Sequence, residues 1–444
     1  MAFSNDFLWG AATSSYQIEG AWNTDGRGET IWDRFCHTVP SKVANRDSGD
    51  VACDHYHRYR DDVALMRELG LQAYRFSVAW SRVLPAGIGP INAKGLDFYS
   101  RLVDELLASG IQPYLTLYHW DTPQALQDRG GWANPDSVQW FAEYAEVMTR
   151  HLGDRVQHWT THNEPWIVAF VGYFYGGHPP GTTDLSTAYQ VAHHLLLAHG
   201  AASPIIRQNV PNSRLGISLN LNPIYPGAAE TEHMSAAFRQ DGFLNRWMLD
   251  PLFKGVYPAD MVELVRPYLP PIDLAAIKSA AVPLDFLGVN YYLRNVVLDD
   301  EKELPLHLRH IIPENAETTA LGWEIFPEGL TTLMVRLQQD YAPAAIYITE
   351  NGAAFDDMVA ADGTIHDPQR IAYFESHLAA LERAIEQGVA VKGYFAWSLM
   401  DNFEWSHGYD KRFGLIHVDY ATQKRTFKQS ALYYREKILS TTRG

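Results

Sequence analysis

Apolar side chains recur along this chain with two alternating periods, which predicts helices that are separated by strands. One helical stripe, which Gly70 ends, consists of Tyr56, Tyr59, Val63, Met66 and Leu69. A second stripe covers residues 96–107, and a third predicted helix covers residues 135–152. Each of these helices is followed by a run rich in β-branched and aromatic side chains, which is typical of a strand.

The same alternation predicts eight strands, over residues 7–12, 73–80, 111–120, 156–164, 215–220, 286–292, 346–350 and 391–397. Strands that are separated by helices pair in parallel through right-handed crossovers, and eight such units predict a closed (β/α)8 TIM barrel. An open, doubly wound sheet is the alternative, which the lack of a glycine-rich phosphate loop after the first strand disfavours. Because no linker or low-complexity segment interrupts the chain, we expect residues 1–444 to form a single domain.

Two glutamates lie at the ends of predicted strands that are far apart in the chain. Glu164 belongs to the motif THNEP, where Pro165 ends strand pairing, and Glu350 belongs to YITENG, which ends in an Asn-Gly turn signal. The carboxyl ends of the strands form the active face of such a barrel, so we expect both carboxylates on one face. Two carboxylates from different strands are the pair that glycoside cleavage requires. Three further reactive or aromatic side chains occupy predicted strand ends: His119, Tyr292 and Trp397.

Six motifs occur in the same order as in a known enzyme family: FLWGAATSSYQIEG, LYHWDTPQALQDRGGW, THNEP, NYY, YITENG and WSLMDNFEW. From about residue 7 to residue 434 the chain thereby resembles glycoside hydrolase family 1, the β-glucosidase family. The resemblance implies a retaining β-glucosidase that removes terminal, non-reducing β-D-glucosyl residues from short oligosaccharides and aryl glucosides by double displacement, without a cofactor. It also implies that Glu164 is the acid/base and Glu350 the nucleophile.

The resemblance further assigns residues that would bind the sugar: Gln17, His119, Asn163, Tyr292, Trp397, Glu404 and Trp405. Trp397 would stack under the apolar face of the sugar ring. We expect Arg75 and Asn290 to support the carboxylates, with Arg75 as the positive charge that lowers the pKa of Glu350. Trp120 and Trp323 are expected on the aglycone side, where the leaving group binds.

Alternative functions depend on a few of these residues. Family members that act on phosphorylated sugars carry a smaller residue and a nearby cation in the region of Glu404, so an ionised Glu404 favours an unphosphorylated sugar. A non-catalytic sugar-binding barrel would have lost one catalytic carboxylate, and neither is lost. A transglycosylase would share every residue, so the balance between hydrolysis and transfer stays open. Aglycone preference, tolerance of galactose or fucose, and inhibition by glucose also stay open.

Several histidines suggest two further roles, tuning of the acid/base residue and metal binding. Members of the family often have an apolar residue where this chain has His162, and strand alternation would place His162 on the face of Glu164. We expect a hydrogen-bonded interior histidine there rather than a residue that tunes the acid/base. The chain has two histidine pairs, His55 with His57 and His193 with His194. Neither pair has a third potential ligand at a spacing typical of zinc sites, so we expect no metal.

Composition narrows the expected partners and location. The formal net charge of −16 disfavours nucleic acid and anionic membranes and suits a neutral oligosaccharide or aryl glycoside. The chain has no run of about 18 apolar residues and no basic and apolar leader, so we expect neither a membrane span nor a signal peptide. Cys36 and Cys53 are too few for a disulfide framework, although whether they pair stays open. We therefore expect a cytoplasmic enzyme, whose oligomeric state the sequence does not indicate.

Overall fold

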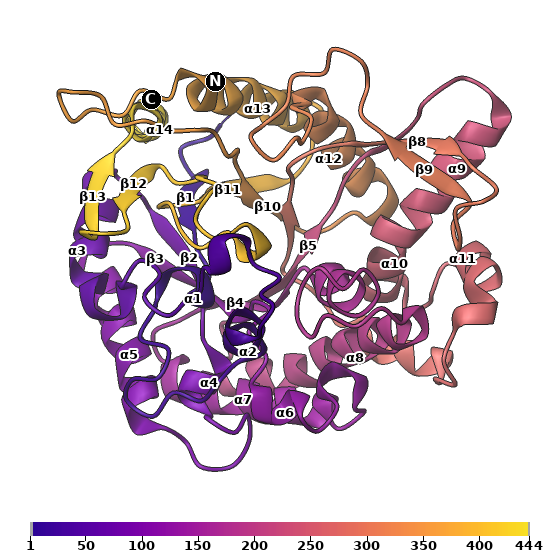
Figure 1. The fold of residues 1–444 in the computed structure, drawn as a ribbon, viewed down its shortest axis with the longest axis horizontal. Coiled ribbons are helices and arrows are strands. Elements are labelled where there is room, and N and C mark those ends of the chain that lie inside the picture. The colour runs from indigo at the N-terminus through magenta and orange to yellow at the C-terminus, as the bar shows by residue number, and fades with distance from the viewer. Residues whose placement is uncertain (1–2, 443–444) are drawn as a thin grey trace.

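Eight parallel strands form a closed barrel in the computed structural model of this protein, which describes residues 3–442 (Figure 1). Around the barrel the strands follow the order β1-β11-β10-β7-β5-β4-β3-β2. Their bounds are β1 (Leu8–Ala12), β2 (Ala73–Ser77), β3 (Gln112–Tyr118), β4 (His158–Asn163), β5 (Arg214–Asn220), β7 (Phe286–Asn290), β10 (Ile346–Asn351) and β11 (Val391–Trp397). The predicted (β/α)8 barrel is confirmed, and each of the eight predicted strands overlaps one of these, with β5 and β10 each extending one residue beyond the predicted range.

Several observed strands are shorter than the predicted ranges, and in two of them the backbone shows why the strand ends early. The run over residues 73–80 leaves the sheet after Ser77, because Trp80 begins the short helix α4 (Trp80–Val83). The run over residues 156–164 ends at Asn163, because Glu164 has φ of 48°, which lies outside the β region. The backbone therefore departs from strand geometry where the candidate site residues begin.

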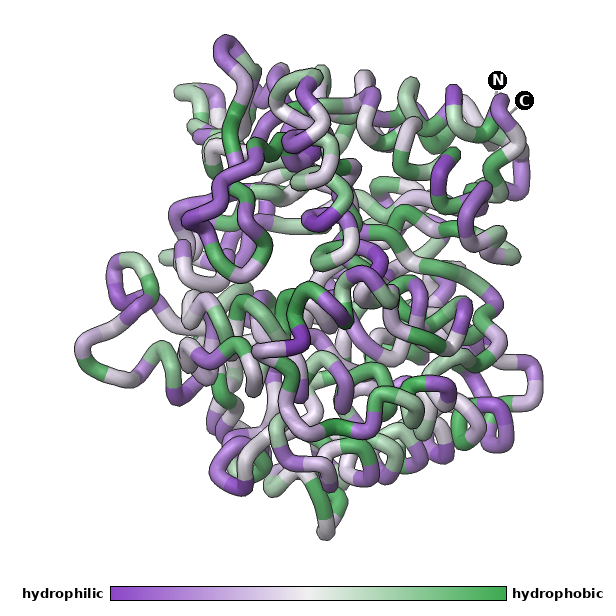
Figure 2. The backbone as a smooth tube through the Cα atoms, turned by 90° about the vertical axis from the view of Figure 1, so that its right-hand side faces the viewer, coloured by the Kyte–Doolittle hydropathy of each residue, from purple (hydrophilic) through white to green (hydrophobic). Residues whose placement is uncertain are grey.

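Helices surround the barrel on its outer side (Figure 1). The long ones are α3 (His55–Glu68), α5 (Ala93–Ala108), α7 (Ser137–Leu152), α8 (Leu185–Asn209), α12 (Pro327–Tyr341), α13 (Pro368–Glu386) and α14 (Gln429–Thr442). The shorter ones are α1 (Ser15–Ile18), α2 (Ile31–His37), α6 (Gln124–Gln127), α9 (Thr231–Asp241), α10 (Trp247–Lys254) and α11 (Ala259–Val265). The three predicted helices are confirmed as α3, α5 and α7. Figure 2 shows hydrophobic and hydrophilic residues alternating along much of the backbone, as elements with one buried face require.

Two small sheets lie outside the barrel, in segments that follow barrel strands. Strands β6 (Ile224–Pro226), β8 (Asn295–Asp299) and β9 (Leu308–Ile311) form one sheet, which packs against α9 (Figure 1). Strands β12 (Ile416–Asp419) and β13 (Lys424–Phe427) form an antiparallel pair. Strands β6 and β8 of the first sheet follow the carboxyl ends of β5 and β7, so this sheet borders the active face of the barrel.

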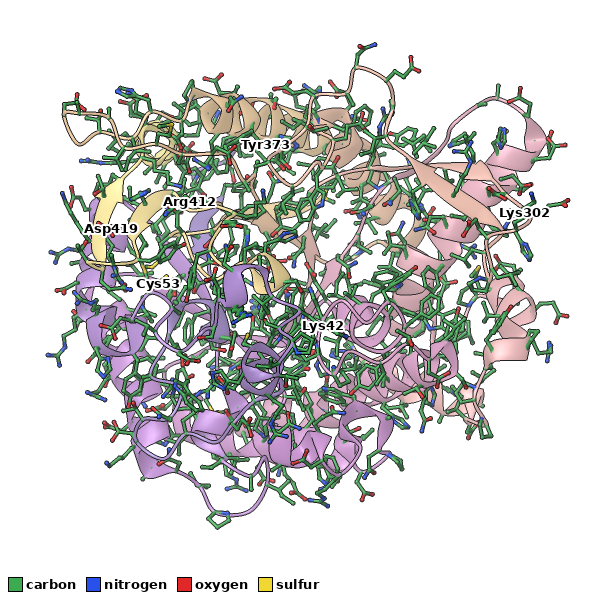
Figure 3. The ribbon with its side chains drawn as sticks, viewed as in Figure 1. Lys42, Cys53, Lys302, Tyr373, Arg412 and Asp419 are labelled. Atoms are coloured by element: carbon green, nitrogen blue, oxygen red, sulfur yellow. The ribbon has the colours of Figure 1, made fainter. Side chains whose placement is uncertain are left out.

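The two cysteines are free thiols, and both are buried, so they do not pair. Cys53, labelled in Figure 3, donates a hydrogen bond from Sγ to the carbonyl oxygen of Asp401 at 3.0 Å. Within residues 3–442, none of the helices combines the length and apolar character that crossing a membrane requires.

A buried cluster of charges holds the segment that follows β11. Lys428 is fully buried and donates from Nζ to Asp401 at 2.6 Å and to Asp357 at 2.5 Å. Arg412, labelled in Figure 3, donates to the other carboxylate oxygen of Asp401 at 2.6 Å. Since each of these charges has an opposite partner, the cluster stabilises Asp401 within the segment 398–405, which carries candidate sugar-binding residues.

Replacing Lys428 with Met should lower the free energy of unfolding by about 3–5 kcal/mol, because the substitution removes one partner of a buried ion pair. The measurement is the midpoint of urea unfolding followed by tryptophan fluorescence. Lys437→Met is the matched control, since Lys437 pairs with Glu382 at 3.4 Å and is 28% exposed. Pairs of that kind contribute about 0–1 kcal/mol. Equal losses in the two variants would contradict the role assigned to the cluster.

Candidate active site

The carboxyl ends of the barrel strands open into a cavity of about 240 Å³. Both predicted catalytic glutamates, Glu164 and Glu350, line it. Eight other predicted site residues line it as well: His119, Trp120, Asn290, Tyr292, Trp323, Trp397, Glu404 and Trp405. The remaining three, Gln17, Arg75 and Asn163, are buried. Arg75 and Asn163 bond to the cavity residues Glu350 and His119, whereas Gln17 bonds to Phe403, the residue before Glu404.

The backbone of β4 delivers Glu164 to the cavity. The register between β4 and β5 shifts between Thr160 and Asn163, as in a β-bulge, and the amide of Glu164 then donates to the carbonyl of Ser218 at 2.8 Å. Glu164 itself has φ of 48°, in the left-handed region. Two other cavity residues share this unusual backbone state: Trp120 with φ of 76° and Trp405 with φ of 48°. Such strain is concentrated at functional sites, where surrounding contacts hold it in place.

The environment of Glu164 favours its protonated form. Burial raises the pKa of this carboxyl, and the negative charge of Glu350 raises it further. Asn290 opposes these effects by donating from Nδ2 to Glu164 at 2.5 Å. Glu164 is therefore suited to carry a proton near neutral pH and to donate it.

The carboxylate of Glu350 has more hydrogen-bond donors around it than that of Glu164. Burial also raises the pKa of Glu350, but the Arg75 guanidinium opposes this rise by donating to Oε1 at 2.6 Å. Tyr292 donates its hydroxyl to Oε2 at 2.7 Å and also favours the charged form. The two carboxyl groups in this cavity thus differ in how well their neighbours stabilise the charged form. Such a difference allows one carboxyl group to act as an acid and the other as a nucleophile.

Arg75 also orients Asn163. Its second terminal nitrogen donates to Oδ1 of Asn163 at 2.6 Å, and Asn290 donates to the same oxygen at 3.1 Å. With Oδ1 facing two donors, the amide nitrogen of Asn163 faces Nε2 of His119 at 3.0 Å. Burial, and then the charge of Arg75, lower the pKa of His119, so its imidazole is neutral and can both donate and accept hydrogen bonds.

Aromatic rings enclose the inner end of the cavity. The ring of His119 lies 6.0 Å from those of Trp397 and Trp405 and is nearly parallel to both. Trp397 is only 3% exposed, and its peptide bond to Ser398 is cis. Glu404 lies beside this group, and burial, followed by the charge of Glu350, raises its pKa to about 8. The inner end therefore combines flat apolar surfaces with a carboxyl group, which suits a sugar ring and its hydroxyls.

Gln17 is fully buried, and its amide is occupied by protein partners. Ser14 donates to Oε1 at 2.6 Å, while Nε2 donates to Asn402 at 3.0 Å and to the carbonyl oxygen of Phe403 at 2.8 Å. In this structure Gln17 thus connects α1 to the residues directly before Glu404.

The sequence matches the model of the family described as glycosyl hydrolase family 1 over residues 1–443. This chain belongs to glycosyl hydrolase family 1. It is 47% identical to beta-glucosidase A of Acetivibrio thermocellus, over 99% of this chain and 98% of that protein. Identity to beta-glucosidase A of Thermotoga maritima is 46%, over 98% and 97% of the two chains. The fold is similar to that of a Thermotoga maritima beta-glucosidase in complex with deoxynojirimycin, with a TM-score of 0.97, 45% identity and 99% of each chain covered.

The two tryptophans predicted for the aglycone side lie in different places around the cavity of this family 1 chain. Trp120 donates from its indole nitrogen to the carbonyl oxygen of Asn163 at 3.0 Å, and its ring lies 4.5 Å from that of Trp405. Trp323 is half-buried and packs between Tyr292 at 5.4 Å and Phe413 at 6.1 Å. Trp120 thus adjoins the inner aromatic group, whereas Trp323 stands nearer to solvent.

Sequence reasoning missed other residues that line the cavity, including Ile167, Asn220, Asn222, Leu321, His407 and Phe413. Asn220 ends β5, so the rule that barrel strands end at the active face could have found it. Phe413 comes from an irregular loop and His407 from a single 3-10 turn, and no periodic pattern predicts the position of either. Leu321 belongs to a hairpin that reaches the cavity from outside the barrel.

The expected position of His162 is wrong. Its ring stacks on Phe141 of α7 at 4.4 Å, and it also packs against Tyr118 and Trp132, so it lies between the barrel and the helices and not beneath Glu164. Side chains of β4 do not alternate strictly between its two faces here, because the register of β4 shifts before Asn163.

The four histidines of the two pairs each form a hydrogen bond within the protein. His55 pairs with Asp62 at 2.8 Å and His57 with Asp54 at 2.6 Å. On α8, His193 contacts the Tyr257 hydroxyl at 3.0 Å and His194 the carbonyl oxygen of Trp132 at 2.8 Å. In the part of the chain that the structure describes, no group of three or more His, Cys, Asp and Glu side chains could hold a metal ion.

Replacing Tyr292 with Phe should raise the pKa of Glu350, because it removes a hydrogen bond to the charged carboxylate. The acid limb of the pH profile of kcat/KM reports the nucleophile in the free enzyme, so this limb should move to higher pH. Activity would then be lost at pH values where the parent enzyme still works. The profile is measured with a nitrophenyl glucoside. An acid limb that stays in place, or moves to lower pH, would show that the Tyr292 hydroxyl does not stabilise the ionised nucleophile.

Proposed function

We propose that this chain is a retaining β-glucosidase that releases terminal, non-reducing glucose from short β-linked oligosaccharides and aryl β-glucosides. The observation that carries the proposal is the pair Glu164 and Glu350, which line one cavity, where only Glu350 accepts hydrogen bonds from Arg75 and Tyr292. Inverting and retaining glycosidases both use two carboxyl groups, and the family membership of the chain favours retention. The cavity has an inner aromatic end for one sugar ring and a more exposed end for the leaving group.

In the first step Glu350 attacks the anomeric carbon while Glu164 protonates the oxygen of the leaving group. The bond between the anomeric carbon and that oxygen breaks, and a covalent glucosyl ester of Glu350 forms. Arg75 and Tyr292 hold the attacking carboxylate in its charged form before the step. The proton leaves Glu164 with the leaving group, so this residue ends the step as a carboxylate.

In the second step Glu164 takes a proton from water, which attacks the anomeric carbon and releases glucose from Glu350. The charge of Glu350 helps to raise the pKa of Glu164, and esterification removes that charge. The pKa of Glu164 therefore falls when the intermediate forms, and the residue changes from an acid to a base. When the ester is cleaved, Glu350 regains its charge and Glu164 keeps the proton.

Sugar recognition follows from the inner end of the cavity. Trp397 would stack on the apolar face of glucose, while His119, Asn163 and Glu404 would bind its hydroxyl groups. Hydroxyl groups that donate to Glu404 favour its ionised form and so lower its raised pKa in the complex. A carboxylate at this point suits a neutral sugar and repels a sugar phosphate. We also propose a cytoplasmic location, which the two free thiols support.

The function is tested by the stereochemistry of the first product. NMR of the reaction of the parent protein with a nitrophenyl glucoside should show β-glucose before mutarotation, because two inversions restore the configuration. Glu350→Ala should abolish turnover, and added azide should restore cleavage and yield α-glucosyl azide. Initial α-glucose from the parent protein, or near-normal turnover in the variant, would refute the mechanism.

Replacing Glu404 with Ser should lower kcat/KM for a nitrophenyl glucoside about 10–100-fold. A hydrogen bond to a charged group contributes about 1.5–3 kcal/mol, and each tenfold change in rate corresponds to about 1.4 kcal/mol. The loss should be smaller for the 6-phosphoglucoside, because the substitution also removes a repulsive charge. The gluco, galacto and 6-phosphogluco nitrophenyl substrates are compared in both proteins. Unchanged kcat/KM across the series would mean that Glu404 does not bind the sugar.

A further inference from the structure

A short hairpin outside the barrel forms part of the cavity wall. This hairpin, residues 317–325, lies between β9 and α12 and closes through backbone hydrogen bonds from Ile325 to Glu317 at 2.8 Å and from Thr319 to Trp323 at 2.9 Å. Its tip contributes Leu321 and Trp323 to the cavity. The side chains of the tip pack against an apolar cluster that includes Trp397 and Phe413.

The tip of the hairpin stands at the more open end of the cavity. Leu321 and Trp323 are half-buried, whereas Trp397 at the inner end is only 3% exposed. A terminal glucose unit enters the closed end, and the rest of the substrate must extend toward solvent. The hairpin therefore faces the leaving group and not the sugar that is released.

One ion pair fixes the base of the hairpin. Arg294 donates from Nε and from a terminal nitrogen to the two carboxylate oxygens of Glu324, each at 2.8 Å. Both side chains are largely buried, with exposed fractions of 17% and 10%. The guanidinium of Arg294 also lies 3.7 Å from the ring centre of Phe326 and 5.2 Å from that of Tyr225. Because the planar guanidinium of Arg294 makes two parallel hydrogen bonds and also contacts two aromatic rings, it has one favoured position.

The anchor belongs to a segment that also serves the catalytic residues. Arg294 follows Tyr292, which donates to the nucleophile Glu350, by two residues. The tip has a second attachment, where the amide of Ala320 donates to the carbonyl of Ala354 at 2.9 Å, close to the end of β10. The hairpin is thus attached to the segments that follow β7 and β10. The attachment to the segment after β7 is the ion pair of Arg294 with Glu324.

Resting on the proposed glucosidase function, we propose that the pair Arg294–Glu324 is a specificity device that positions Trp323 and Leu321 against the leaving group. It would make the enzyme favour aromatic and long apolar leaving groups over small ones. Arg294 is a positioning residue in this scheme, because it acts through the hairpin. Replacing it with Met removes both hydrogen bonds and leaves the Glu324 carboxylate without its partner, so the hairpin should lose its fixed position.

The test compares two alkyl glucosides with similar leaving-group chemistry, n-octyl and methyl β-glucoside. Arg294→Met should lower the ratio of kcat/KM for octyl to kcat/KM for methyl glucoside by about tenfold, at the lower end of the roughly 10–200-fold that apolar contacts contribute to discrimination. Both rates come from one preparation, so partial unfolding lowers them equally and leaves the ratio unchanged. Trp323→Ala should lower the ratio as well, and the double variant should show no further loss, since both substitutions remove the same contact.

Arg239→Met is the matched control. Arg239 forms a comparable ion pair with Asp299, with exposed fractions of 21% and 25%, and neither residue lines the cavity. Its substitution should leave the octyl-to-methyl ratio unchanged. Glu324→Gln keeps the shape of the side chain and removes its charge, so it should lower the ratio by less than Arg294→Met.

The outcomes separate this inference from the proposed function. If the parent protein cleaves neither alkyl glucoside nor a nitrophenyl glucoside, the proposed function fails. If the parent cleaves them and Arg294→Met leaves the ratio unchanged, only the role of the ion pair is overturned. Additive losses in the double variant would also overturn it, because they would mean that Arg294 and Trp323 act on the substrate independently.

Discussion

The pairing of Arg75 with Glu350 is the interaction on which the site depends. Two carboxyl groups in one buried cavity repel each other, and burial disfavours the charged form of both. Arg75 stabilises the charge of one of them, and its second terminal nitrogen orients the amide of Asn163. One buried guanidinium thus stabilises the charged form of Glu350 and also fixes the direction of the Asn163 amide. Asn290 completes the arrangement by donating to both Glu164 and Asn163.

The barrel provides rigid strand ends, and short departures from strand geometry aim the side chains. Glu164, Trp120 and Trp405 all have left-handed backbone conformations, which neighbouring contacts must maintain. The segment after β11 is held from one side by the buried ion pairs of Asp401 and from the other by the amide of Gln17. The segment that carries Glu404 and Trp405 is therefore fixed by polar contacts that are largely buried.

The two ends of the cavity differ in how they are built. The inner end is made of residues that the barrel strands and their immediate extensions supply, such as His119 and Trp397. At the outer end, Leu321 and Trp323 come from a hairpin that is anchored by side-chain and single backbone contacts. A change in the anchor can alter the outer end while the catalytic pair stays in place. Under the proposed function, this construction would allow leaving-group preference to vary without a change in the chemistry.

The sequence by itself determined the barrel and singled out the two glutamates that line its cavity, because both depend on local patterns. Alternating periods of apolar residues predict eight strand–helix units, and the short motifs around Glu164 and Glu350 each lie at one strand end. Tertiary structure decided the environment of these residues. Arg75 meets a carboxylate 275 positions away, and Phe413 reaches the cavity from an irregular loop. A bulge in β4 turned His162 toward the helices, and no pattern of periods predicts such a register shift. Local sequence sets which face of an element is buried, whereas pKa values and hydrogen-bond partners depend on groups that only folding brings together.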